Sequence, residues 1–141
     1  MKDKVFRIID ANLNRSREGL RVCEDIARFG LNSRTLAQEL KSVRHSISAS
    51  AIGFAGKLKE LSASRDSEED VLKSSRLDSE MKRRTFADIF AANIERVKES
   101  LRVMEELFKL INVKGSSKFR NLRFKIYTIE KKAMKRLYDA D

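Results

Sequence analysis

The sequence predicts an all-α protein, an antiparallel four-helix bundle built from two pseudo-symmetric helix hairpins. The chain of 141 residues has no proline and only five glycines, so the residues that tight turns between short strands require are nearly absent. Apolar residues recur over most of the chain at the three- and four-residue spacing of amphipathic helices. The length suits one domain, which we take as residues 1–141.

The first predicted hairpin covers about residues 4–61. Its first helix is expected to stop at Gly30, because glycine readily adopts the backbone conformation that ends a helix. Ser33 is placed to cap the second helix, whose apolar face extends from Leu36 to Leu58. The first hairpin is therefore two long helices joined by a short turn.

The second predicted hairpin covers about residues 78–138, after a polar and aperiodic connection over about residues 62–77. Its first helix is expected from about residue 78 to Ile111. Ser116 or Ser117 is expected to cap the last helix. Long helices with mostly short connections favour a bundle.

An internal repeat relates the two hairpins. Residues 5–29 align with residues 86–110 at a constant offset of 81 positions, and nine of these 25 residues are identical. The helices that follow align weakly, through Arg44 with Arg123. Chance similarity between helices explains matched leucines better than matched asparagines and arginines, so we expect a pseudo-two-fold relation. The matched polar residues are Asn12/Asn93, Arg15/Arg96, Glu18/Glu99, Arg21/Arg102 and Glu24/Glu105.

Helical wheels place an amide and a guanidinium within the apolar arc of each repeated helix. These are Asn12 and Arg15 in the first helix, and Asn93 and Arg96 in the third. The same wheels place arginines within the apolar arcs of the second and fourth helices. These two arginines are Arg44 and Arg123.

Inward arginines require partners, because an unpaired buried charge costs several kcal/mol. Glu18 and Glu99 lie one turn beyond the arginines of the repeated helices and could pair with them. One interpretation is a closed network of asparagine, arginine and glutamate that fixes how the hairpins pack. The other is a basic, amide-lined cavity for a phosphorylated small molecule. The repeat does not decide between them, since pseudo-symmetry would duplicate either.

Charge and composition limit the function classes. The net charge of +10 favours anionic partners such as phosphates or nucleotides. A single cysteine, Cys23, excludes a disulfide framework and a thiolate metal cluster. No apolar run approaches membrane-spanning length, so we expect a cytoplasmic protein without a membrane partner. The basic faces are more typical of solvated helices than of nucleic-acid interfaces, and a homo-oligomer stays open.

Several segments resemble one known family. It is the all-helical domain found fused ahead of thiamine-phosphate synthase in some bacteria and described as an alternative hydroxymethylpyrimidine phosphate kinase. The resemblance covers nearly the whole chain in order. It rests on RIIDANLNRSREGLRVCEDIARF (7–29), LKSVRHSI (40–47), Arg65-Asp66 followed by Asp70-Val71, FAANIERVKESLRVMEEL (90–107) and FRNLRFKIYTIEKKA (119–133).

The resemblance implies that ATP, with magnesium, phosphorylates 4-amino-5-hydroxymethyl-2-methylpyrimidine phosphate to the diphosphate used in thiamine biosynthesis. Phosphoryl transfer requires mainly positioning and charge stabilisation, which inward arginines can provide. We therefore assign catalytic roles to Arg15 and Arg96. Substrate or nucleotide binding is assigned to Asn12, Glu18, Arg44, Arg65, Asp66, Asn93, Glu99 and Arg123. Magnesium would also require a carboxylate near the phosphates, and the candidates, without a ranking among them, are Glu18, Glu99, Asp66 and Asp70.

Two other classes of function stay open. The chain could be a non-catalytic helical module that holds or regulates thiamine-phosphate synthase, and its asparagines and arginines would then be structural. It could also be a basic helical RNA-binding protein. Binding driven by nucleic-acid phosphates weakens steeply with salt, whereas a specific small-molecule pocket is less sensitive.

Overall fold

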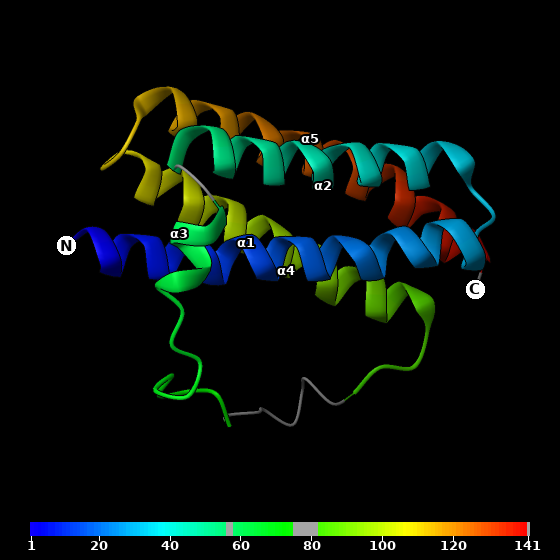
Figure 1. Ribbon diagram of the computed structural model, residues 1–141. Coiled ribbons are helices and arrows are strands. Elements are labelled where there is room, and N and C mark those ends of the chain that lie inside the picture. The colour runs from blue at the N-terminus through cyan, green and yellow to red at the C-terminus, as the bar shows by residue number, and fades with distance from the viewer. Residues whose placement is uncertain (56–57, 75–81, 141) are drawn as a thin grey trace.

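The computed structural model describes residues 1–55, 58–74 and 82–140. Every regular element in these ranges is helical, which confirms the all-α class (Figure 1). The elements are α1 (Lys2–Asp25), a π-helical turn η1 (Ile26–Gly30), α2 (Arg34–Ala55), α3 (Leu58–Ala63), α4 (Phe86–Phe108) and α5 (Val113–Ala140).

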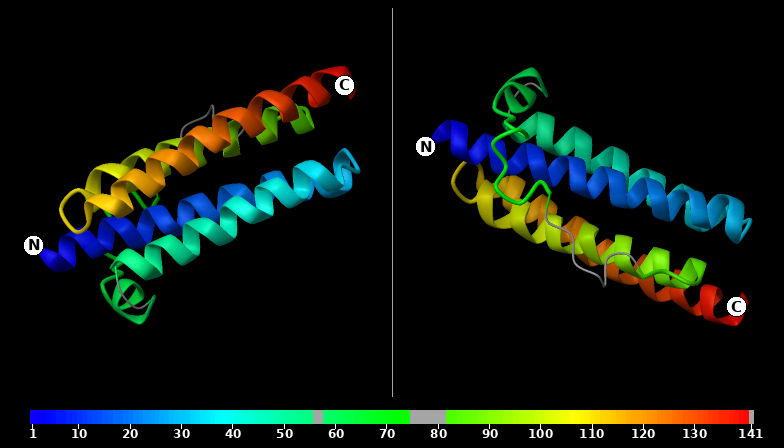
Figure 2. Two further views of the ribbon diagram at one scale, coloured as in Figure 1. Left: turned by 90° about the horizontal axis from the view of Figure 1, so that it is seen from above. Right: turned by 90° about the horizontal axis from the view of Figure 1, so that it is seen from below.

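The long helices α1, α2, α4 and α5 lie side by side, and each packs against two of the others (Figure 2). Helix α1 contacts α2 and α4, and α5 contacts the same two helices. In Figure 1, α1 and α5 run from the end marked N towards the end marked C, while α2 and α4 run back. The short helix α3 lies beside the beginning of α1.

The core lies between the four long helices. Each contributes apolar side chains at helical spacing, and one hydrophobic cluster joins them. Completely buried members include Ile9 and Leu20 in α1, Leu40 and Ile47 in α2, Phe90 and Leu101 in α4, and Phe119 and Ile126 in α5.

Glycine permits a close approach of α1 to α4. A Cβ atom at Gly19 would lie 2.9 Å from Cγ2 of Val97 and 3.0 Å from the carbonyl oxygen of Asn93. Such distances are shorter than packed atoms tolerate, and the Asn93 carbonyl belongs to a helix backbone that cannot easily yield. The separation of α1 and α4 therefore depends on the missing side chain at Gly19.

The turn between α1 and α2 follows the sequence prediction. Helical structure ends at Gly30, as expected. Ser33 caps α2, because its Oγ accepts a hydrogen bond from the backbone N–H of Leu36 at 3.3 Å. The expected packing of Leu58 lies outside the residues whose side chains are described.

The prediction that the third helix begins near residue 78 was wrong. Residues 82–84 are not helical, and α4 begins at Phe86; residues 78–81 lie outside the described ranges. Thr85 and Asp88 form a reciprocal capping box, in which the Thr85 side chain accepts from the Asp88 N–H and the Asp88 carboxylate accepts from the Thr85 N–H. This cap stops the helix from extending further towards the N-terminus.

The cap predicted for the last helix was also wrong. Helix α5 begins at Val113, and the Asn112 side chain accepts hydrogen bonds from the N–H groups of Lys114 and Gly115 at 2.9 and 3.4 Å. Ser116 lies inside the helix, and its hydroxyl donates to the carbonyl oxygen of Glu105 at 2.8 Å. No helix of the described residues is long and apolar enough to cross a membrane.

We predict that Gly19→Ala lowers the free energy of unfolding by ~1–3 kcal/mol, because the added methyl group must displace the α4 backbone. Urea unfolding followed by circular dichroism measures this change. Gly53→Ala is the matched control, since nothing lies within 4 Å of a Cβ at Gly53. That substitution should stabilise by up to ~1 kcal/mol, and equal effects of the two would contradict the close contact.

Candidate functional site

Two carboxylate–guanidinium pairs connect neighbouring long helices in the interior of the protein. Arg44 donates from Nε to Glu24 Oε2 at 2.5 Å and from Nη2 to Glu24 Oε1 at 3.1 Å. Arg123 donates from Nη2 to Glu105 Oε1 at 3.0 Å. Each pair joins neighbouring helices, α1 to α2 and α4 to α5.

These pairs provide carboxylate partners for the inward arginines of the second and fourth helices, although the buried Nε of Arg123 has no hydrogen-bond partner among the described residues. The side chains of Arg44 and Arg123 are 14% and 11% exposed, as their positions on the helical wheel predicted. The hydrogen bonds that the two guanidinium groups donate to Glu24 and Glu105 raise the pKa of both arginines. Both arginines therefore face glutamates of their own hairpin, and neither lines the cleft described below.

The expected inward position of Arg15 and Arg96 was wrong, because both side chains are exposed. Glu18 and Glu99, the carboxylates expected beside them, are exposed as well. The apolar arc drawn on the wheel was too wide, and a long charged side chain at its edge extends to water. Ile8, at the same edge, is also 41% exposed.

The two repeated asparagines are less exposed than these arginines. Asn12 is buried and Asn93 is half-buried. Each donates from Nδ2 to the carbonyl oxygen four residues earlier at 2.8 Å, Asn12 to Ile8 and Asn93 to Ile89. The two halves thus share this local hydrogen bond as well as the interior ion pairs.

A cleft of about 810 Å³ lies between α1 and the segment that follows α3. It brings together five of the residues predicted for the site. The other five do not line it; they are Asn93, Arg96, Glu99, Arg44 and Arg123. The predicted residues in the cleft are Asn12, Arg15, Glu18, Arg65 and Asp66.

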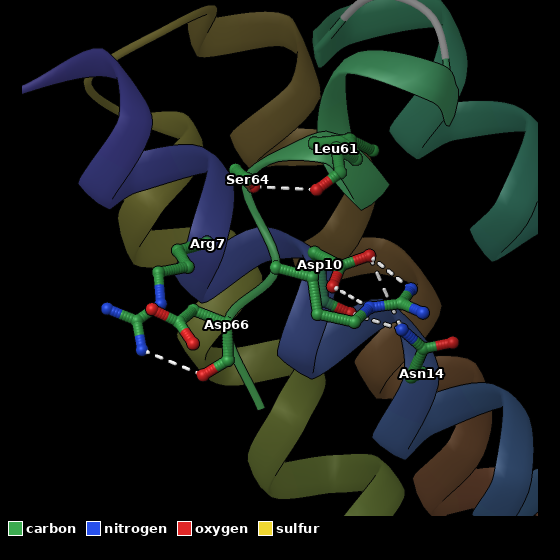
Figure 3. Close-up of polar contacts among 7 residues, drawn as sticks. Arg7, Asp10, Asn14, Leu61, Ser64 and Asp66 are labelled. Carbon is green, nitrogen blue, oxygen red and sulfur yellow. Dashed lines mark hydrogen bonds and ion pairs between the residues drawn. The ribbon is translucent and has the colours of Figure 1, made fainter. Parts of the chain in front are cut away.

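A buried aspartate of α1, Asp10, lines this cleft. Figure 3 shows its polar contacts. Asp10, in α1, is 2% exposed. It accepts two hydrogen bonds from Arg65, at 2.8 Å from Nε and 2.9 Å from Nη2. Asn14 donates from Nδ2 to the carbonyl oxygen of Asp10 at 2.9 Å. The pair raises the pKa of the Arg65 guanidinium, through its hydrogen bond to Asp10.

The backbone around Arg65 is held as well (Figure 3). Ser64 donates from Oγ to the carbonyl oxygen of Leu61 at 2.6 Å. On the other side, Arg7 donates from Nη2 to the carbonyl oxygen of Asp66 at 3.1 Å. Together with the Asp10–Arg65 pair, the Arg7 contact attaches the polar segment after α3 to α1 at two points.

The cleft carries charges of both signs. Cations from Lys4, Arg7, Arg15 and Arg65 face carboxylates of Glu18, Asp66, Glu69 and Asp70. Arg15 makes no ion pair with any described residue, so its guanidinium is free to bind an anion. Among the described residues no group of three or more His, Cys, Asp or Glu side chains is placed to hold a metal ion.

Sequence reasoning missed Asp10, Glu24 and Glu105 as site or interior residues. The glutamates carried a usable signal, because both Glu24/Glu105 and Arg44/Arg123 are matched pairs of the repeat. Asp10 carried no such signal, because the residue aligned with it in the repeat is Ala91.

Residues 7–132 match the ThiD2 family, and the chain therefore belongs to that family. It is similar to proteins named thiamine-phosphate synthase. The relative from Nostoc sp. (strain PCC 7120) is 38% identical over 92% of this chain and 35% of its own length. The relative from Prochlorococcus marinus (strain AS9601) is 38% identical over 90% of this chain and 34% of its own length.

A relative from Rhodopirellula baltica, also named thiamine-phosphate synthase, is 36% identical over 87% of this chain and 32% of its own length. The chain thus spans about a third of the length of these relatives. No solved structure matches it.

We predict that Arg44→Ala and Arg123→Ala each lower the free energy of unfolding by ~3 kcal/mol, because each removes the hydrogen-bonded cation of a buried carboxylate. Arg15→Ala and Arg96→Ala should change it by no more than ~0.5 kcal/mol, as exposed side chains do. Urea unfolding of the four variants tests both statements. Equal losses in all four would contradict the distinction between interior and exposed arginines.

Proposed function

We propose that this domain acts in thiamine biosynthesis and transfers the γ-phosphoryl group of MgATP to 4-amino-5-hydroxymethyl-2-methylpyrimidine phosphate. The observation that carries the proposal is the cleft in which Asn12, Arg15, Glu18, Arg65 and Asp66 meet. Membership of the ThiD2 family and the similarity to thiamine-phosphate synthases support the pathway.

The chemistry requires little from the protein beyond positioning. A phosphate monoester is largely ionised near neutral pH, so its oxygen attacks without a general base. A bond forms between that oxygen and the γ-phosphorus, the bond to the β-bridging oxygen breaks, and ADP leaves with the electron pair. Arginines stabilise the negative charge on the transferring group.

We assign the acceptor phosphate to Arg15 and Arg65, which line the same cleft and expose guanidinium groups to it. Asn12 lies beside them and uses Nδ2 to bind the Ile8 carbonyl, so its Oδ1 is the acceptor for the amino group of the pyrimidine. We assign Arg96 to the ATP phosphates. Asn93 is one turn before Arg96, and its carbonyl oxygen lies close to Gly19 where α1 contacts α4. The two copies of the repeated motif therefore lie next to each other at this contact.

Magnesium enters this scheme with ATP. Asp66 and Asp70 line the cleft, and each also accepts a backbone hydrogen bond within its own loop, from Glu69 and Leu72. Their exposed carboxylates fit an ion that binds through one or two protein ligands and keeps its phosphate and water ligands.

A non-catalytic module is the second candidate. The observation that favours it is the pairing of Arg44 with Glu24 and of Arg123 with Glu105, which gives the interior arginines a structural role. In that case the domain would hold or regulate a thiamine-phosphate synthase and would release no ADP.

We further infer that the four long helices form an antiparallel four-helix bundle of two pseudo-symmetric hairpins. The recurring asparagine hydrogen bonds of α1 and α4 support this inference. An experimental structure whose halves superpose by a rotation near two-fold would bear it out.

The test is ADP release from MgATP with and without the pyrimidine phosphate. We expect release to depend on the pyrimidine phosphate. Arg15→Ala should raise the KM for that substrate by ~10-fold or more, and Arg96→Ala should raise the KM for ATP. Arg102→Ala is the control, because Arg102 is exposed on α4 and pairs with Glu106 one turn away. Release that does not respond to the pyrimidine phosphate would favour the non-catalytic module.

A further inference from the structure

The Asp10–Arg65 pair joins residues that are 55 positions apart in the chain. The carboxylate is buried and fully engaged, whereas the Arg65 side chain is 49% exposed. A buried carboxylate on the wall of a cleft costs free energy unless it is paired, and the bidentate geometry supplies the pairing. Asp10, the buried partner, thus holds Arg65 in place. Arg65, the exposed partner, is available to a ligand in the cleft.

Arg65 keeps donors available for a ligand. A guanidinium has five N–H donors in a planar fork, and Asp10 takes one from Nε and one from Nη2. Three N–H donors therefore stay free of Asp10, two of them on Nη1. Because Asp10 fixes the plane of the fork, these donors point in a set direction, which suits two oxygens of one phosphate group.

The backbone restraints around Arg65 add to this fixed orientation. The Ser64 hydroxyl and the Arg7 guanidinium hold the chain on either side of Arg65. A side chain held from both its backbone and its head group loses little further freedom when a ligand binds. The cleft therefore contains an arginine that is held in place, Arg65, and another, Arg15, that makes no ion pair with the described residues.

The repeat departs from its pattern at this point. The offset of 81 matches Asn12, Arg15 and Glu18 with identical residues in α4. Asp10, however, corresponds to Ala91, and Asn14 corresponds to Glu95. Helix α4 therefore has no carboxylate at the position that corresponds to Asp10.

We propose that Asp10 is a positioning residue that holds Arg65 to bind the phosphate group of a phosphate monoester, and that the chain builds this subsite once, on α1. The proposal deepens the proposed function, because it assigns the acceptor phosphate of that reaction to one half of the repeat. Asp10 itself does not touch the substrate.

Calorimetric titration of the folded chain tests the subsite without turnover. The ligands are the pyrimidine phosphate and the unphosphorylated hydroxymethylpyrimidine. Asp10→Ala and Arg65→Ala should each weaken binding of the phosphate form by about 10- to 100-fold and leave the alcohol unaffected. The double variant should bind no more weakly than Arg65→Ala, because Asp10 acts through Arg65.

Asp10→Asn separates positioning from folding. Asparagine keeps the shape of the side chain but replaces one acceptor oxygen by an NH2 donor that faces a guanidinium N–H, so it should lose phosphate binding as Asp10→Ala does while disturbing the packing less. Glu39→Ala is the control, because Glu39 pairs with Lys132 between α2 and α5, at 2.7 Å and away from the cleft. It should leave both titrations unchanged.

The outcomes also separate this proposal from the proposed function. If the wild-type chain releases no ADP but binds the pyrimidine phosphate in an Asp10-dependent way, the subsite stands and the kinase assignment falls. If ADP is released and the Asp10 and Arg65 variants keep the wild-type KM and affinity for the phosphate form, the positioning role is overturned. Variants that only lose stability, with unchanged affinity of the folded protein, overturn it as well.

Discussion

The pairing of Glu24 with Arg44, and of Glu105 with Arg123, constrains the rest of this structure. A carboxylate buried among apolar helices requires a cation at hydrogen-bond distance, since leaving it unpaired costs several kcal/mol. Each pair thereby sets the register of the two helices it joins, α1 with α2 and α4 with α5. The hydrophobic core forms between hairpins that are aligned in this way.

The same pairing occupies the interior arginines. Arg44 and Arg123 are largely buried against glutamates of their own hairpin, and neither lines the cleft. Arg15 and Arg65 lie on the outer side of α1, where they line a cleft that the polar segment after α3 completes. That segment is attached to α1 by Asp10 and Arg7.

The two halves of the repeat thus share a framework and differ in their surfaces. The interior ion pairs and the asparagine hydrogen bonds recur in both. The arginine that Asp10 anchors lies beside α1, and the position in α4 that corresponds to Asp10 is an alanine. Duplicated helices keep what the core requires, and one copy can then acquire a site that the other lacks. The ThiD2 family membership and the thiamine-phosphate synthase relatives give this site its proposed phosphorylated substrate.

The sequence by itself determined the helical class, the turn at Gly30 and Ser33, the repeat, and the inward direction of Arg44 and Arg123. These depend on periodicity and on contacts between residues close in the chain, which a sequence displays directly. The tertiary structure decided that Arg15 and Arg96 reach water, because a wheel gives the angle of a side chain but not how far its neighbours cover it. It also decided the meeting of Asp10 with Arg65. That contact joins a helix to an aperiodic segment 55 residues later, and no local pattern encodes where such a segment folds back.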